Sequence, residues 1–376
     1  MAVLHIFNPE HDIALAANLS NFTAPHAGRQ LRHDLGYLPA VWAAPEDYVL
    51  VDDVEVAKKA FSRLMHRQYS HFIDKHQLST LSAQFSTVSP WGWDLALRSL
   101  LLRCGVCAVP SEEDVAGIRD LSHRKHAVDL LRELDFDGTT GCSWCADTVV
   151  EVQQAIRNHS RIVVKAPWSS SGRGIRFIDG ALDEYQKRWI ENVVARQRCV
   201  VIENYCHKVK DFGMEFESDG EGGVNYLGLS LFHTQNAAYT GNILATEEEK
   251  LEMISRYISV DRLNVVKEKI CTVLGALYKD RYKGPFGIDM MIVRGSENGQ
   301  WSMANGQFLL HPCVEINLRR TMGHVAIELS KHFPSGSTMN IVFSDNRYRL
   351  NVAHSSLIKS GSTIKSGVGA KPQECA

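Results

Sequence analysis

The segment from residue 163 to residue 178 constrains the fold of this chain more than any other. A β-branched run ends in Lys165, a loop of small residues follows, and residues 175–178 again have the pattern of a strand. Serine and glycine let backbone N–H groups turn toward an anion without crowding by a Cβ atom, and Lys165 and Arg173 add positive charge. The segment is either a flap over phosphate groups or an ordinary polar hairpin.

The familiar phosphate-binding motifs do not explain this loop. The sequence has no G-x-x-x-x-G-K-[ST] segment, and the G-R-G run at 172–174 lacks the third glycine of the dinucleotide fingerprint. The D-F-G run at 211–213 resembles a protein-kinase element. However, no H-R-D loop precedes it, and Lys165 comes before the glycines instead of after them. These observations exclude a P-loop, a dinucleotide fingerprint and a protein-kinase site.

Two later segments carry oxygen-bearing side chains. Residues 287–293 and 308–318 have strand patterns and are separated by polar turns. Because alternate residues of a strand share a face, Glu315, Asn317 and Arg319 lie together, and Asp289 can complete the cluster from the other strand. Two carboxylates and an amide oxygen are ligands that Mg²⁺ prefers beside phosphate and water. The alternative is an exposed polar sheet face, which the apolar remainder of both strands disfavours because isolated buried carboxylates are costly.

With these motifs, the chain resembles the ATP-grasp superfamily from about residue 110 to residue 326. Lys125 and Lys165 match the two phosphate-binding lysines of the family, and the loop at 169–174 resembles its glycine-rich flap. Glu203 and the groups after it resemble the hinge that meets adenine, and Asp211 matches the carboxylate for the ribose hydroxyls. The resemblance implies that ATP is bound by Lys125, Lys165, Ser169, Ser170, Ser171, Gly172, Gly174, Glu203, Asn204, Cys206 and Asp211.

The same resemblance assigns the metal ligands and the catalytic groups. It implies that Asp289, Glu315 and Asn317 bind Mg²⁺ or Mn²⁺, and their Glu-x-Asn-x-Arg pattern is similar to that of biotin carboxylase and carbamoyl phosphate synthetase. Ligases of the D-alanine:D-alanine type place an arginine just before the first metal aspartate, but residues 284–288 contain none. Arg319, or else Arg320, is therefore expected to stabilise the transferring phosphoryl group together with Lys165.

The activity that the resemblance implies is an ADP-forming ligase. It would join a carboxylate to an amine or another nucleophile through an acylphosphate. Its partners would be small-molecule or peptide-like carboxylates and amines, and a homodimer is a family expectation. Two alternatives stay open: a small-molecule kinase, and a nucleotide-binding regulatory protein without ligase activity.

The expected fold combines α/β and α+β parts. Alternating β and α patterns, from a strand at 3–7 to a helix at 93–102 and a strand at 106–109, predict a Rossmann-like α/β domain at 1–112. Two α+β lobes that clamp ATP follow at 113–200 and 201–354. Residues 355–376 are rich in serine, glycine and lysine, which predicts a disordered tail.

The first domain is expected to hold the acceptor substrate, because ligands of such sheets bind where strands end and loops begin. The candidates for this role follow the first strand, flank a later turn, or come from the second lobe. They are Asn8, Glu10, His11, Asp12, Trp91, Tyr239 and Arg320. Other readings remain: Asn8 or Asp12 can cap a helix, and tryptophans at a helix start more often pack in a core.

Composition limits the remaining classes. The 43 acidic and 41 basic residues give a net charge of −2, so nothing favours binding to nucleic acid or to a membrane surface. The apolar runs are too short for a membrane span, and we expect a cytoplasmic enzyme. Nine cysteines fit reduced thiols. Two C-x-x-C pairs, Cys104/Cys107 and Cys142/Cys145, are too far apart in sequence for the usual zinc ribbon, so zinc is not expected.

Overall fold

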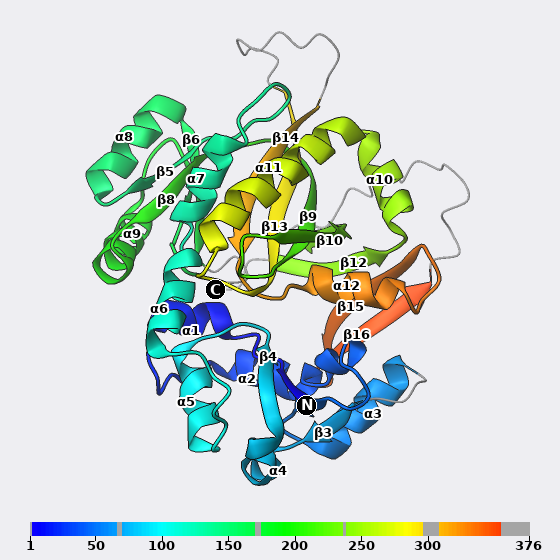
Figure 1. Ribbon diagram of the computed structural model, residues 1–376. Helices are drawn as coiled ribbons and strands as arrows, with labels where there is room; N and C mark the ends of the chain where they lie inside the picture. The colour runs from blue at the N-terminus through cyan, green and yellow to red at the C-terminus, as the bar shows by residue number, and fades with distance from the viewer. Residues whose placement is uncertain (1, 66–69, 170–173, 236–237, 296–307, 355–376) are drawn as a thin grey trace.

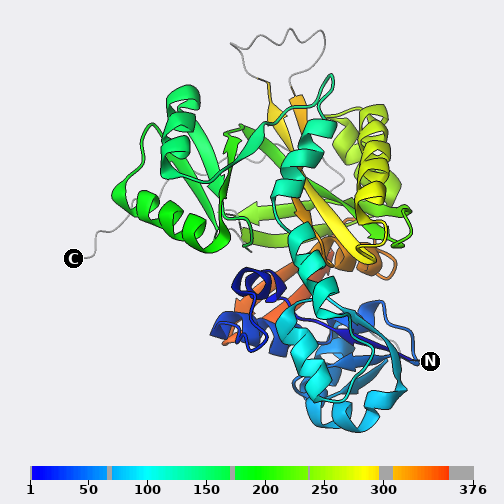
Figure 2. The same cartoon turned by 60° about the vertical axis from the view of Figure 1, so that its left-hand side comes forward.

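The computed structural model describes residues 2–65, 70–169, 174–235, 238–295 and 308–354 of the 376-residue chain. Within these residues the strands form four sheets of four strands each. Figures 1 and 2 show the first sheet with its helices at one end of the molecule and the second and third sheets at the other. None of the described helices combines the length and the apolar character that crossing a membrane requires.

The first sheet is parallel and has the strand order β3-β2-β1-β4. Its strands are β1 (Ala2–Ile6), β2 (Tyr48–Leu50), β3 (His71–Ile73) and β4 (Phe85–Pro90). The accompanying helices are α1 (His11–Ala17), α2 (His26–Leu35), η1 (Leu38–Val41), α3 (Val54–Leu64), α4 (Lys75–Leu81), η2 (Ser82–Gln84) and α5 (Leu95–Arg103). Parallel strands need crossover connections, and these helices supply them. The prediction of a Rossmann-like α/β domain at the N-terminus is thereby confirmed.

The strand predicted at residues 106–109 is wrong. This stretch has no regular structure, although Val106 is fully buried against the first sheet's core. Its backbone groups bond locally: the N–H of Val106 donates to Leu101 at the end of α5, and the N–H of Val109 donates to Cys107. The apolar character of residues 106–109 therefore reflects burial and not a strand conformation.

The second sheet is antiparallel and has the order β5-β8-β6-β7. It consists of β5 (Ser143–Ala146), β6 (Arg161–Lys165), β7 (Ile175–Asp179) and β8 (Val200–Asn204), with α8 (Val149–His159) and α9 (Glu184–Gln197) packed against it. Two helices, α6 (Glu112–Leu121) and α7 (Lys125–Glu133), precede it. The hairpin expected from residue 163 to residue 178 is present as β6 and β7, with Lys165 opposite Ile175. Ser170, Ser171 and Gly172 lie outside the described residues.

The third sheet holds the segments with the oxygen-bearing side chains. Its antiparallel strands, in the order β10-β9-β13-β14, are β9 (Lys208–Ser218), β10 (Val224–Ser230), β13 (Gly284–Arg294) and β14 (Phe308–Asn317). Two further helices belong to this part, α10 (Glu247–Ser255) and α11 (Val260–Tyr278). Residues of α7 and α11 share one core with this sheet, in which the rings of Phe216 and Phe286 stack with centroids 5.2 Å apart.

The fourth sheet connects the two ends of the molecule. Its strands, in the order β11-β12-β15-β16, are β11 (Phe232–Gln235), β12 (Ala238–Leu244), β15 (Ser337–Ser344) and β16 (Arg347–His354), and α12 (Met322–Ser330) precedes β15. Leu350 of β16 belongs to the same core as Leu35 and Phe61 of the first domain, and Figure 1 shows β16 beside the blue helices. The extent of the predicted second lobe, residues 201–354, stays a prediction, because the fourth sheet packs on the N-terminal part.

Candidate functional site

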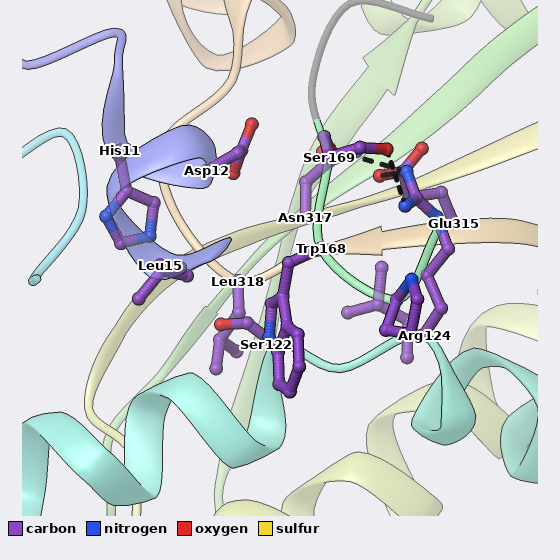
Figure 3. A pocket seen from close by; sticks show the side chains of 12 residues that line it. His11, Asp12, Leu15, Ser122, Arg124, Trp168, Ser169, Glu315, Asn317 and Leu318 are labelled. Carbon is purple, nitrogen blue, oxygen red and sulfur yellow. Dashed lines mark hydrogen bonds and ion pairs between the residues drawn. The ribbon is translucent and has the colours of Figure 1, made fainter. Parts of the chain in front are cut away.

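A cavity lies where three parts of the chain meet. Figure 3 shows His11 and Asp12 of α1 on one side of it, and Arg124, Ser169 and Glu315 on the other. The remaining walls come from the segment before α7, the segment after β6 and the end of β14. Among the described residues, the lining consists of His11, Asp12, Leu15, Ser122, Arg124, Pro167, Trp168, Ser169, Glu315, Ile316, Asn317 and Leu318.

Strands β13 and β14 bring three oxygen-bearing side chains together, and two of them, Glu315 and Asn317, line this cavity. Asp289 is the register partner of Glu315, and Asn317 is the partner of Gly287. Burial and the nearby Glu315 carboxylate together raise the pKa of Asp289 to about 7, against a hydrogen bond with Asn317 that lowers it. A bound cation would relieve this pair of like charges. The register of the two strands agrees with the prediction from strand alternation that these side chains share one face.

The donor set fits a hard divalent cation. It offers carboxylate and amide oxygens, which Mg²⁺ and Mn²⁺ prefer. Among the described residues, no group of three or more histidine, cysteine, aspartate or glutamate side chains is arranged to hold a metal. The cluster here has two carboxylates, so further ligands would have to come from phosphate oxygens and water. The role of these residues as metal ligands stays a prediction.

Arg124, which sequence reasoning missed, ties the walls of the cavity together. Its side chain is only 6% exposed, and Nη2 donates to Oε1 of Glu315 at 2.6 Å. Nη1 donates to Oγ of Ser169 at 2.9 Å and also to the carbonyl of Ala166. Arg124 thus bonds to both the segment after β6 and strand β14. The signal available in the sequence was a second basic residue directly before Lys125.

Lys125 does not line this cavity. Its ammonium group donates to Oδ1 of Asp120 at 2.5 Å, and its side chain is 42% exposed. Adjacent residues of a helix point about 100° apart, so the rotation of α7 that turns Arg124 inward turns Lys125 outward. The predicted contact of Lys125 with phosphate stays a prediction.

Lys165 forms a buried ion pair with Glu203. Nζ lies 2.6 Å from Oε1, and both side chains are less than a tenth exposed. Nζ also donates to the carbonyl of Val314 at 3.2 Å, which joins the second sheet to β14. Two residues expected at the cofactor site are thus each other's partners in this structure.

The other predicted nucleotide-binding residues surround the β8–β9 connection. Burial raises the pKa of the Cys206 thiol to about 11, with Glu203 adding to the shift. Oδ1 of Asn204 is buried without a hydrogen-bond partner. Asp211 accepts hydrogen bonds from Lys208 and Thr234, both at 2.6 Å. Gly174 accepts a hydrogen bond from the N–H of Ala166 at the base of the predicted flap. Their contacts with a nucleotide stay predictions.

His311 is a second residue that sequence reasoning missed. It lies on β14 at the same alternation as Glu315, and it is almost fully buried, with Nδ1 unpaired. Burial lowers its pKa to about 4; the Glu203 charge opposes this shift, and the Lys165 charge adds to it. The period-2 argument used for Glu315 also places His311 on the same strand face and would have found it.

Asp12 binds Arg319 across the cavity. Nε and Nη2 of Arg319 donate to the two carboxylate oxygens of Asp12, each at 2.8 Å, and Nη2 also donates to Oδ1 of Asn317 at 3.0 Å. Bidentate pairs of this kind fix orientation as well as charge. The pair holds the arginine that was expected to stabilise the phosphoryl group beside Asn317 and against the N-terminal domain.

The other N-terminal candidates, Asn8, Glu10 and His11, contact residues of the N-terminal domain. Nδ1 of His11 lies 3.4 Å from Oδ2 of Asp94, and Nδ2 of Asn8 donates to the same oxygen at 3.2 Å. Asp94 also caps α5 by accepting from the N–H of Leu97. Glu10 is ion-paired with Arg32, and burial raises its pKa. Of this group, only His11 lines the cavity.

Three predicted substrate residues do not line the cavity. Trp91 is buried with its ring edge-on to Phe7, 4.9 Å between centroids. The hydroxyl of Tyr239 donates to Asn242, and the Arg320 guanidinium lies 4.6 Å from the ring centre of Trp42. The aromatic residue at the cavity is instead Trp168, whose ring carries the Arg119 guanidinium at 3.7 Å.

The four cysteines weighed as a zinc site are free thiols. Cys104 ends α5 and is buried, whereas Cys107, Cys142 and Cys145 are exposed. Cys142 and Cys145 flank or belong to β5, in a different sheet from the one beside α5.

Comparisons with known proteins identify the fold. No family model and no curated protein matches the sequence. Among solved structures, a biotin carboxylase from Campylobacter jejuni in a beta-gamma-ATP complex has a TM-score of 0.52 at 14% identity, covering 92% of this chain and 76% of its own. Pyruvate carboxylase from Rhizobium etli has a TM-score of 0.50 at 14% identity, with 88% of this chain and 27% of its own covered. N5-carboxyaminoimidazole synthetase from Staphylococcus aureus, complexed with ADP, has a TM-score of 0.49 at 12% identity, with 92% and 83% covered. The predicted ATP-grasp fold is confirmed.

Proposed function

We propose that this chain, which has the ATP-grasp fold, is an ADP-forming ligase that joins a carboxylate to an amine. The observation that carries the proposal is the cluster of Asp289, Glu315 and Asn317, with Arg319 bonded to it, at the meeting point of three parts of the chain. The cluster is negatively charged and the groups around it are positively charged, as a site for a metal–phosphate complex requires.

Asp289, Glu315 and Asn317 would hold Mg²⁺ or Mn²⁺. A cation held there would neutralise negative charge on the phosphates. The raised pKa of Asp289 supports this assignment, because burial and the neighbouring Glu315 carboxylate disfavour its ionised form, which a bound cation would stabilise. Arg124, which binds Glu315, sets the orientation of that carboxylate from the opposite side.

Lys165, Arg124 and Ser169 would meet the phosphates of ATP, and Glu203, Asn204, Cys206 and Asp211 would hold the adenosine part. Lys165 is bonded to Glu203, and phosphate oxygens would be a further partner for its ammonium group. Little covalent work then falls on the protein, since phosphoryl transfer is accelerated mainly by positioning and charge neutralisation.

The reaction would proceed in two steps. A carboxylate oxygen of the substrate attacks the γ-phosphorus, the bond to the β-phosphate oxygen breaks, and an acylphosphate and ADP result. An amine then attacks the acyl carbon, inorganic phosphate leaves, and the amine releases a proton. Arg319 would stabilise the transferring group because Asp12 and Asn317 fix its guanidinium beside the metal cluster.

The direct test is ADP release with paired carboxylates and amines, combined with mass detection of the joined product. In Glu315→Gln the volume is kept and the charge is lost, and we expect turnover to fall by at least about 100-fold. Glu184→Gln, on the exposed first turn of α9, is the matched control. Undiminished turnover in Glu315→Gln would remove the basis of the assignment, and a stable phosphorylated product without condensation would favour a kinase.

A further inference from the structure

A second cavity of about 320 Å³ lies between the first domain and the fourth sheet, away from the residues of the candidate site. Helices α2 and α3 form one wall and strand β16 forms the other. A volume of this size is in the range of pockets that bind small organic ligands. None of its lining residues takes part in the proposed ligase chemistry.

The wall made by α2 and β16 is held together by Asp34. Its Oδ2 accepts a hydrogen bond from the backbone N–H of Tyr348 at 2.8 Å and another from Gln30 at 2.9 Å. Asp34 is buried, and these two hydrogen bonds stabilise its carboxylate. The cavity is therefore a formed feature of the packing between these elements.

Tyr37 supplies an unused hydrogen-bond donor to this cavity. The residue is only 3% exposed and its ring packs edge-on against Phe61. Over the described parts of the chain, its hydroxyl has no hydrogen-bond partner, and burial alone raises its pKa. Because the residue lines the cavity, an oxygen atom of a ligand would supply the acceptor that this hydroxyl lacks.

Two arginines, Arg63 and Arg349, outnumber the single carboxylate of the lining, Asp34, so the charged groups favour an anion. Arg63, at the end of α3, makes no ion pair within the described ranges, and Arg349 of β16 is bonded only to Ser344 and to the exposed Asp345. An exposed ion pair such as Arg349–Asp345 contributes little and is readily exchanged. Leu64, Phe333 and Leu350 add an apolar surface.

We propose that this cavity is a binding site for a small carboxylic acid with an apolar body that carries a hydroxyl or carbonyl oxygen. The carboxylate is bound by Arg63 and Arg349, the body packs on Leu64, Phe333 and Leu350, and the second oxygen accepts a hydrogen bond from Tyr37. This site is separate from the proposed ATP site.

The test uses the full chain and titration calorimetry with three probes. 4-Hydroxyphenylacetate carries all the proposed features, phenylacetate lacks the second oxygen, and tyramine replaces the carboxylate by an ammonium group. We expect 4-hydroxyphenylacetate to bind one-to-one with a Kd below about 1 mM, to bind more tightly than phenylacetate by roughly fivefold, and tyramine not to bind.

Two variants assign the binding to this cavity. Tyr37→Phe removes only the unpartnered hydroxyl, so it should fold normally and bind both acids equally. Arg63→Gln should weaken both acids about tenfold, whereas Arg188→Gln, an exposed arginine of α9, is the control and should change neither. If Arg63→Gln does not fold, Arg349→Gln replaces it.

Three results would overturn the proposal. They are no binding of either acid at about 10 mM, binding of tyramine as tight as that of the acids, and affinities unchanged in both Tyr37→Phe and the arginine variant. None of these measurements needs ATP turnover, so the proposal fails or stands independently of the proposed ligase activity.

Discussion

Replacing Glu203 by glutamine should destabilise the contact between the second sheet and β14 by about 3 kcal/mol. Lys165 and Glu203 are less than a tenth exposed, with Nζ and Oε1 2.6 Å apart. Loss of one partner of a buried pair leaves the other charge unpaired, which costs roughly 3–5 kcal/mol. We expect the lower end, because the glutamine oxygen and the Val314 carbonyl still accept hydrogen bonds from the ammonium group.

Hydrogen exchange of peptides from β6 and β8 measures this change locally, which suits a chain with several sheets. A loss of 3 kcal/mol corresponds to exchange about 150-fold faster in these peptides. Glu184→Gln, on the exposed start of α9, is the control and should leave the exchange unchanged.

A double variant separates the ion pair from simple loss of packing. Lys165→Met with Glu203→Leu removes both charges and keeps most of the apolar volume, so we expect a change within about 1 kcal/mol of the wild type. The reasoning is refuted if Glu203→Gln accelerates exchange less than about threefold, or if the double variant is destabilised by the sum of the two single changes.

Three further predictions concern the same region. Burial lowers the pKa of His311 to about 4, whereas the unfolded value is near 6.5. Its neutral form therefore stabilises the fold fully above pH 6.5, and that stability is lost as the pH falls toward 4. Thermal melts should show a shallower acid loss in His311→Gln than in the wild type or in the exposed-site control His76→Gln, and equal slopes would contradict this. Asp12→Asn breaks the bidentate pair with Arg319, so kcat for ADP release should fall more than about tenfold with a smaller change in KM for ATP; a change confined to KM would argue against positioning. Removing divalent cations with EDTA should lower the melting temperature of the wild type at pH 8, because the Asp289 and Glu315 carboxylates then repel each other, and Asp289→Asn should respond much less. An equal response in both proteins would mean that the cation binds elsewhere.

The sequence by itself determined the local arrangement of the candidate site. Strand alternation requires only neighbouring residues, so it placed Glu315, Asn317 and Arg319 in one row before any contact was known. The turn between two apolar strands made Asp289 the natural partner across the ladder, and the register bears this out. The hairpin around Lys165 could likewise be predicted from neighbouring residues alone.

Tertiary structure alone decided which of these groups meet residues from distant segments. The choice of Arg124 over Lys125 follows from the rotation of α7, which its packing against β14 sets and which helical periodicity leaves open. Asp12 and Arg319 are 307 positions apart, and their pairing depends on how the N-terminal domain docks on the third sheet. The packing of the fourth sheet on the N-terminal domain likewise forms the cavity that Tyr37 lines. Short-range patterns fix which face a side chain occupies, but contacts between distant segments are fixed by the packing of whole elements, which no local pattern encodes.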